Sequence, residues 1–236
     1  MITGPDNPAP IWPQPPGHGL LVRTARLVLR PPQPNDRAEY VRMHTVSEEH
    51  FAPWLPALSD IGATSYDELF ERHLARSAEG LVTGACLRLV ALTHGGGGRI
   101  VGCFNLNNII RGMFLNADAG WHVSADAAGR GYATEAMSAV LTLAFLPEPL
   151  PAEGAPQRGT LCGLGLHRVQ AGVIPENVRS IRVAEKLKMR REGVARRYLR
   201  IAGSWQDHII FALTAEETEA VNANAPTGSI QHRGPR

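Results

Sequence analysis

The stretch "SADAAGRGYATEAM", Ser124 to Met137, places two glycines around one arginine just before a helix-forming run. A strand that leads directly into a helix here would present a row of backbone N–H groups at the helix N-terminus, where the helix dipole is positive. Phosphate groups bind at such ends. Gly129 and Gly131 lack the Cβ that would keep a ligand from the main chain, and Arg130 can add a charge-assisted contact. The stretch predicts a phosphate site.

A tight turn without any ligand is the alternative interpretation of Gly129 and Gly131. The pattern is shorter than a dinucleotide fingerprint and lacks the Gly-Lys-Ser/Thr ending of a P-loop. It therefore favours a phosphorylated ligand of another kind.

The rest of the chain alternates between strand and helix patterns in the order βααβββαβαββ. The strands are expected at 26–31, 87–93, 99–106, 116–123, 167–174, 196–201 and 204–214, and the helices at 35–44, 65–77, 134–145 and 177–187. A mixed sheet with helices on both faces would bury their apolar stripes. We expect a fold of the α/β class, of the α+β type.

Composition is typical of one globular domain with a real core: 236 residues, 44% hydrophobic and 19% charged. A formal charge of +2 is too small to indicate nucleic-acid binding. No apolar run reaches the roughly 18 residues that a membrane helix needs, and residues 1–19 lack the pattern of a signal peptide. Cys86, Cys103 and Cys162 show no metal-ligand spacing. We therefore expect no metal, reduced thiols and a cytoplasmic location.

Three segments lack any pattern of regular structure. They are a proline-rich arm at 1–20, an internal proline- and glycine-rich loop at 147–160, and a tail at 218–236. We expect the arm and the tail to be disordered and the loop to be mobile. The folded domain then covers residues 21–217.

Several motifs in one order resemble the GNAT N-acetyltransferases, and within them the RimJ-like branch that acetylates the N-terminal alanine of ribosomal proteins. They are "TARLVLRPPQPND" at 24–36, "NNIIRGMF" at 107–114, "GRGYATEA" at 129–136, "HRVQAGVIPENVRSIRVAEKLKMRREG" at 167–193 and "YLRIAGSWQDHIIFALT" at 198–214. The resemblance implies a GNAT fold, whose mixed, mostly antiparallel sheet is splayed between two strands and flanked by helices.

The resemblance also implies acetyl-CoA as the acyl donor. The implied cofactor-binding residues form the glycine turn, the strand before it and the next helix start: Val123, Ala125, Gly129, Arg130, Gly131, Tyr132, Ala133, Thr134, Asn177 and Ser180. This chain departs from the family pattern at Ala128, before the turn. It also departs at Ala184, where many relatives carry a tyrosine acid, and at Lys188, where a glycine usually ends the helix.

The expected catalytic residues follow from amine acetylation. A protein α-amine, with a pKa of about 7.7 to 8.0, is partly neutral at pH 7, so it needs only a modest base. Asp118 and His122 share one face of their strand and are the candidates; the alternatives are a solvated carboxylate and a packed histidine. Ser180 is the candidate acid for the leaving thiolate, and Glu176 is expected to cap a helix.

Acceptor binding is assigned to Trp54, Asn108, Arg111 and Trp205. For the two tryptophans the alternative is a role as core anchors, and for Arg111 it is a surface position. The arginines at 190, 191, 196, 197 and 200 would hold the adenosine phosphate, approach ribosomal RNA weakly, or form a solvated face.

The expected partner is a protein N-terminus with alanine or serine first, such as that of a small-subunit ribosomal protein. No membrane or specific nucleic acid is expected, and the chain would be a monomer or a homodimer. Two alternatives remain open: a GNAT enzyme that acetylates a small amine, such as an antibiotic, polyamine or amino acid, and a CoA-binding or ribosome-associated module without turnover.

Overall fold

The computed structural model describes residues 20, 22–95, 97–147 and 163–222. Most of the predicted arm, loop and tail, together with Cys162, lies outside these residues. In the described part, eight strands form one sheet in the order β1-β2-β3-β4-β5-β6-β8-β7. The strands are β1 Val22–Arg23, β2 Leu27–Arg30, β3 Leu87–Thr93, β4 Ile100–Ile110, β5 Asn116–Val123, β6 Arg168–Val173, β7 Arg190–Ile201 and β8 Ser204–Thr214.

The sheet is mixed and mostly antiparallel, as predicted. Every neighbouring pair is antiparallel except β5 and β6, which are parallel. The helices are α1 Arg37–Thr45, α2 Glu48–Phe51, α3 Tyr66–Thr83, α4 Tyr132–Phe145, α5 Val178–Lys186 and α6 Ala215–Asn222, with short 3₁₀ helices η1 Pro34–Asp36, η2 Leu58–Ile61 and η3 Ala125–Ala127.

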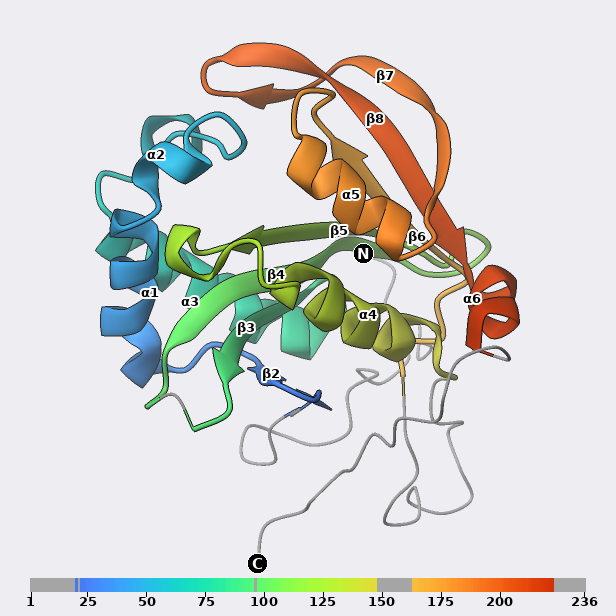
Figure 1. Ribbon diagram of the computed structural model, residues 1–236, viewed down its shortest axis with the longest axis horizontal. Coiled ribbons are helices and arrows are strands. Elements are labelled where there is room, and N and C mark those ends of the chain that lie inside the picture. The colour runs from blue at the N-terminus through green and yellow to red at the C-terminus, as the bar shows by residue number, and fades with distance from the viewer. Residues whose placement is uncertain (1–19, 21, 96, 148–162, 223–236) are drawn as a thin grey trace, which may run out of the picture.

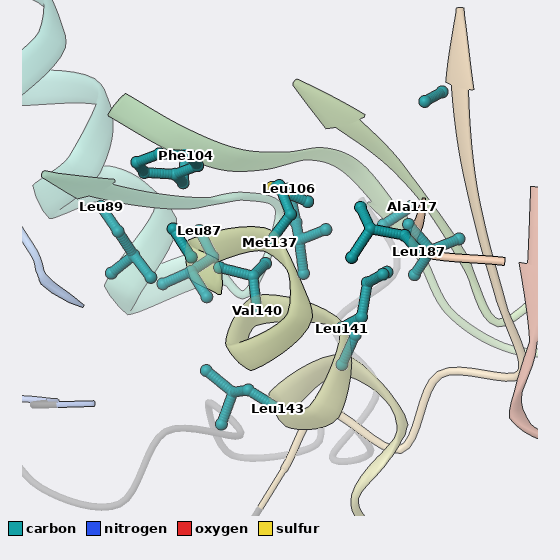
Figure 2. Packing of buried hydrophobic residues seen from close by; sticks show 14 of the residues in the cluster. Leu87, Leu89, Phe104, Leu106, Ala117, Met137, Val140, Leu141, Leu143 and Leu187 are labelled. Atoms are coloured by element: carbon teal, nitrogen blue, oxygen red, sulfur yellow. The ribbon is translucent and has the colours of Figure 1, made fainter. Parts of the chain in front are cut away.

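Helices cover both faces of the sheet, with α4 and α5 on the near side in Figure 1 and α3 behind the strands. Strand β3 illustrates this two-sided packing, because its side chains alternate between two cores. Leu87 and Leu89 belong to the larger core with Met137 of α4, and Figure 2 shows these side chains together. Val90 instead packs with Phe70 of α3 in a second core. The predicted two-sided packing is therefore confirmed.

The sheet opens between β5 and β6. These two strands pair only where Asn116, Ala117 and Asp118 face residues 168–170. Beyond that point β5 stays paired with β4 as far as Val123, whereas β6 stays paired with β8 as far as Val173. The two halves of the sheet diverge past Asp118, which is the predicted splay.

The last helix was not predicted. Residues 218–222, which the sequence assigned to the tail, lie in α6. The helix begins with a capping arrangement, because the carboxylate of Glu217 accepts hydrogen bonds from the N–H (2.9 Å) and the hydroxyl (3.2 Å) of Thr214. The pattern Thr-x-x-Glu is a recognised start signal for a helix. The short elements β1 and α2 were also missed, since two and four residues carry no readable period.

Over the described part of the chain, no helix combines the length and apolar character that crossing a bilayer demands. Cys86 and Cys103 are buried and carry free thiols.

Candidate active site

The glycine turn between β5 and α4 exposes a row of backbone amides. Gly129 and Gly131 both adopt left-handed backbone angles, with φ of 78° and 80°. Gly131 is the N-cap of α4, and it has no side chain to cap the first turn. Among the described residues, none accepts a hydrogen bond from the N–H groups of residues 129–134. The turn therefore offers unpaired donors at the positive end of a helix.

Arg26 holds this turn from the side, and sequence reasoning missed it. Its guanidinium donates to the carbonyl of Arg130 at 2.9 Å and to the carboxylate of Glu135 at 2.6 Å. The same group lies 4.7 Å from the ring centre of Tyr132. Because Arg26 is more than a hundred residues from the turn, only the fold brings them together. The contacts fix the turn without using its N–H groups.

Asn177 and Ser180 begin α5, beside the opening of the sheet. The side-chain oxygen of Asn177 accepts a hydrogen bond of 3.1 Å from the N–H of Ser180, so Asn177 caps this helix. The cap had been expected at Glu176, and this expectation was wrong. No described residue is hydrogen-bonded to the Ser180 hydroxyl, and the side chain is half-buried. Ser180 thus remains available to a ligand.

Asp118 and His122 share one face of β5, as their spacing predicted. Asp118 is not a solvated carboxylate at the end of its strand. It accepts hydrogen bonds from Asn108 (2.7 Å) and Gln170 (2.8 Å), at the last pair that joins β5 to β6. The carboxylate is therefore held in place at the point where the sheet opens.

His122 packs against α1 and α2. Its ring centre lies 5.1 Å from that of Phe51 and 5.4 Å from that of His44. Burial lowers the pKa of His122 well below its usual range, and the neighbouring His44 lowers it further. Its Nε2 atom is buried and has no hydrogen-bond partner among the described residues. His122 is thus a packed, neutral histidine whose Nε2 has no surface for direct contact with a substrate.

The predicted acceptor residues do not form one group. Trp54 is half-buried after α2, whereas Trp205 is 63% exposed near the tip of the β7–β8 hairpin. The segments that carry them meet where the N–H of Gly203 donates to Asp60 at 3.3 Å. No ring contact joins the two tryptophans among the described residues, so the predicted pocket wall is not formed by direct stacking.

The other two acceptor candidates have structural partners. Asn108 donates to Asp118, as described above. Arg111 donates to the carbonyl of Leu164, on the segment that precedes β6. That segment lies next to the Asn116 end of β5. The glycine turn follows the opposite end of β5, at Val123. Arg111 is therefore neither a surface arginine nor a neighbour of the turn.

Two departures from the family pattern have clear structural outcomes. Ala184 is fully buried in the larger core. Alanine has no hydroxyl, so this position supplies no acid in place of the tyrosine of the relatives. Lys188 follows the C-cap Leu187 of α5 and has a left-handed φ of 61°, the conformation that glycine usually supplies after a helix. Of the basic run, Arg190 pairs with Glu192 at 2.7 Å and also with Glu217, and this side of β7 is exposed.

Comparisons with known proteins agree with this fold. The family model described as "Acetyltransferase (GNAT) domain" matches residues 26–190. This chain therefore belongs to the GNAT acetyltransferase family.

Two curated relatives share part of the chain. The "Probable N-acetyltransferase YjcK" of Bacillus subtilis is 35% identical over 121 residues, which are 51% of this chain and 58% of the relative. The ribosomal protein uS5-alanine N-acetyltransferase of Escherichia coli is 29% identical over 118 residues, or 50% of this chain and 53% of the relative. The chain thus spans about half the length of the curated relatives it matches.

A solved structure matches over a longer range. It is described as Mycobacterium smegmatis RimJ in complex with CoA-disulfide, and it is 27% identical to this chain with a TM-score of 0.69. The superposition covers 92% of this chain and 97% of that structure.

Proposed function

We propose that this protein transfers the acetyl group of acetyl-CoA to the α-amine of an N-terminal alanine or serine of another protein, by direct attack in a ternary complex. The observation that carries the proposal is the opening of the sheet past Asp118, together with the unpaired amides before α4, which follow the far end of the same strand. An acyl donor held by the amides would reach an amine held at the opening.

The residues at the glycine turn fit a diphosphate. A Cβ built on Gly129 would meet no other atom within 4 Å, so the space next to this main chain is open. The N–H groups of residues 129–134 supply the donors, and the side chain of Arg130 is exposed and adds a positive charge. The pantetheine arm would follow the backbone at Val123 and Ala125 toward Asn177, where β5 has lost its partner β6.

Asp118 is the group best placed to hold the acceptor amine. Its two hydrogen bonds leave lone pairs on the carboxylate free, and its charge attracts an ammonium group. Because the Nε2 atom of His122 is enclosed, that atom cannot meet the amine directly, which favours Asp118 as the proton acceptor. An α-amine gives up its proton easily, since its pKa is about 7.7 to 8.0, compared with about 10.4 for lysine.

Ser180 would donate to the departing sulfur. A thiol has a pKa near 8.5, so its thiolate is a modest base and one hydroxyl donor suffices. The capped first turn of α5 holds this serine in place, and the positive end of the helix also favours a developing negative charge.

The peptide acceptor is supported by the relatives. The E. coli relative is described as acting on an alanine of a ribosomal protein, and the matching RimJ structure covers nearly the whole folded part. The sequence motifs of the RimJ-like branch also occur throughout this chain. We therefore assign a ribosomal or similar protein N-terminus as the acceptor class.

The test is an acetylation assay that follows free thiol. The protein is incubated with acetyl-CoA and peptides that start with Ala or Ser, the same peptides with a blocked N-terminus, polyamines and aminoglycosides. We expect thiol release only with the free peptides. Release only with polyamines or aminoglycosides would replace the proposed acceptor with a small amine. Binding of CoA without any release would reduce the protein to a CoA-binding module.

A further inference from the structure

Tyr198 of β7 reaches over the neighbouring strand β8 onto β6. Its ring makes an edge contact with that of His208 on β8, with ring centres 5.5 Å apart. A Cβ built on Gly172 of β6 would lie only 3.2 Å from Cε1 of Tyr198, so the tyrosine ring rests on bare backbone. Gly172 is two residues beyond Gln170, the last residue of β6 that pairs with β5. Tyr198 therefore lies beside the opening of the sheet.

The ring lies on the face of the sheet that carries Asp118. Along β6, Ala171 and Val173 point into the larger core beneath α4 and α5, so Gly172 faces the other way, like Gln170. Gln170 binds Asp118 on this second face. His122 lies on the same face against Phe51 of α2. Tyr198 and α2 thus flank the opening from opposite sides.

A bulge in β7 places the tyrosine there. Ala195 pairs with His208 and Leu199 pairs with Gln206, so residues 196–198 face Asp207 alone. Arg197 takes a left-handed φ of 48° within the bulge, and its N–H donates to the Asp207 carboxylate at 2.8 Å. A non-glycine residue in this conformation is strained, and the conformation persists only where its surroundings fix it. Bulges of this kind redirect side chains.

The phenol of Tyr198 is suited to donate a hydrogen bond. A tyrosine has an ordinary pKa of about 10, so its hydroxyl keeps its proton at neutral pH; burial and, after it, the charge of Asp118 raise the pKa of Tyr198 further. Within the described chain, no residue is hydrogen-bonded to this hydroxyl, and the side chain is partly open, with the residue 39% exposed. In a peptide whose α-amine sits at Asp118, the nearest acceptor is the carbonyl of the first residue.

We infer that the Tyr198 hydroxyl donates a hydrogen bond to the first peptide carbonyl of the acceptor and so selects a peptide α-amine over a simple alkylamine. This inference rests on the peptide acceptor proposed above. It adds a specificity residue that comes from β7 and replaces no part of the acyl-donor site.

The test combines Tyr198→Phe with two acceptors. One is a peptide that starts with alanine, and the other is the same peptide with a trans-alkene in place of its first peptide bond. The variant is expected to lower kcat/KM about three- to tenfold for the natural peptide, as the loss of one hydrogen bond predicts. It should leave kcat/KM for the alkene peptide and the pH profile of kcat unchanged. Calorimetric affinity for CoA, also unchanged, would show that the variant is folded.

Equal losses with both peptides, or no loss with either, would overturn the inference. A second variant tests the position of the ring. Gly172→Ala should displace the ring and lower kcat/KM for the natural peptide, and an unchanged value would also count against the assignment. The proposed function fails separately, because it fails when the unmodified protein itself does not acetylate peptides.

Discussion

The carboxylate of Asp118 accepts a 2.8 Å hydrogen bond from Nε2 of Gln170 across the last pair of residues that joins β5 to β6. Asp118, whose side chain links β5 to β6 where the sheet opens, is thus also the residue proposed to bind the acceptor amine. Because Asn108 donates to its other oxygen at 2.7 Å, the carboxylate has a fixed orientation. Fixed orientation is what a proton acceptor in a catalytic site requires.

Asp118→Asn is expected to lower kcat with an alanine peptide about a hundredfold, since the amide can neither take a proton nor carry charge. The side chain keeps its size, so calorimetric affinity for CoA should change little. The matched change Gln170→Glu places a second carboxylate beside Asp118. Compared with the unmodified protein, this variant should lose less activity at low pH than at neutral pH. Full activity in Asp118→Asn would remove Asp118 from the mechanism and return His122, acting through water, as the base.

Gly129→Ala is expected to weaken CoA binding at least tenfold. The new Cβ would stand in the space proposed for the diphosphate, on a residue with φ of 78°. The matched control is Gly203→Ala in the β7–β8 hairpin, where φ is also 78° and a Cβ meets no atom within 4 Å. Both variants carry the same backbone strain, so calorimetry separates strain from loss of the site. Equal affinities would contradict the placement of the diphosphate.

Ser180→Ala is expected to lower turnover about tenfold or more, while the dissociation constant of CoA changes less. The reason is that the hydroxyl is proposed to act on the departing sulfur, which is charged only during the reaction. The hydrogen bond that the N–H of residue 180 donates to the side chain of Asn177 survives in this variant, so α5 should remain intact. Steady-state rates and calorimetry are the two measurements, and unchanged turnover would exclude Ser180.

The sequence predicted the elements with a clear period, and it predicted the turn because glycine, charge and helix start lie within a few residues. It did not reveal contacts made by distant segments. Arg26 meets Glu135 only because the fold brings these two distant segments together. Tyr198 was missed for a different reason: the bulge opposite Asp207 breaks the alternation of β7, and alternation is the only local signal for which face a strand residue occupies.

The buried histidines of α1 and α3 should make stability depend on pH. Burial lowers the pKa of His44 to about 4 and that of His73 to about 3, whereas both should titrate near 6.5 when the chain is unfolded. Between these values the unfolded chain binds more protons than the folded chain, so the free energy of unfolding falls as pH decreases. For His44 alone the loss between pH 7 and pH 5 is about 2 kcal/mol.

His44→Phe should remove this part of the pH dependence while keeping a ring between Tyr40 and Phe51, which His44 contacts at ring-centre distances of 4.5 and 5.5 Å. Urea unfolding at pH 7 and pH 5 measures the effect. The variant is expected to lose about 2 kcal/mol less than the unmodified protein over this interval, because a phenyl ring takes up no proton. A pH dependence as steep as that of the unmodified protein would show that His44 is solvated or already protonated in the folded chain.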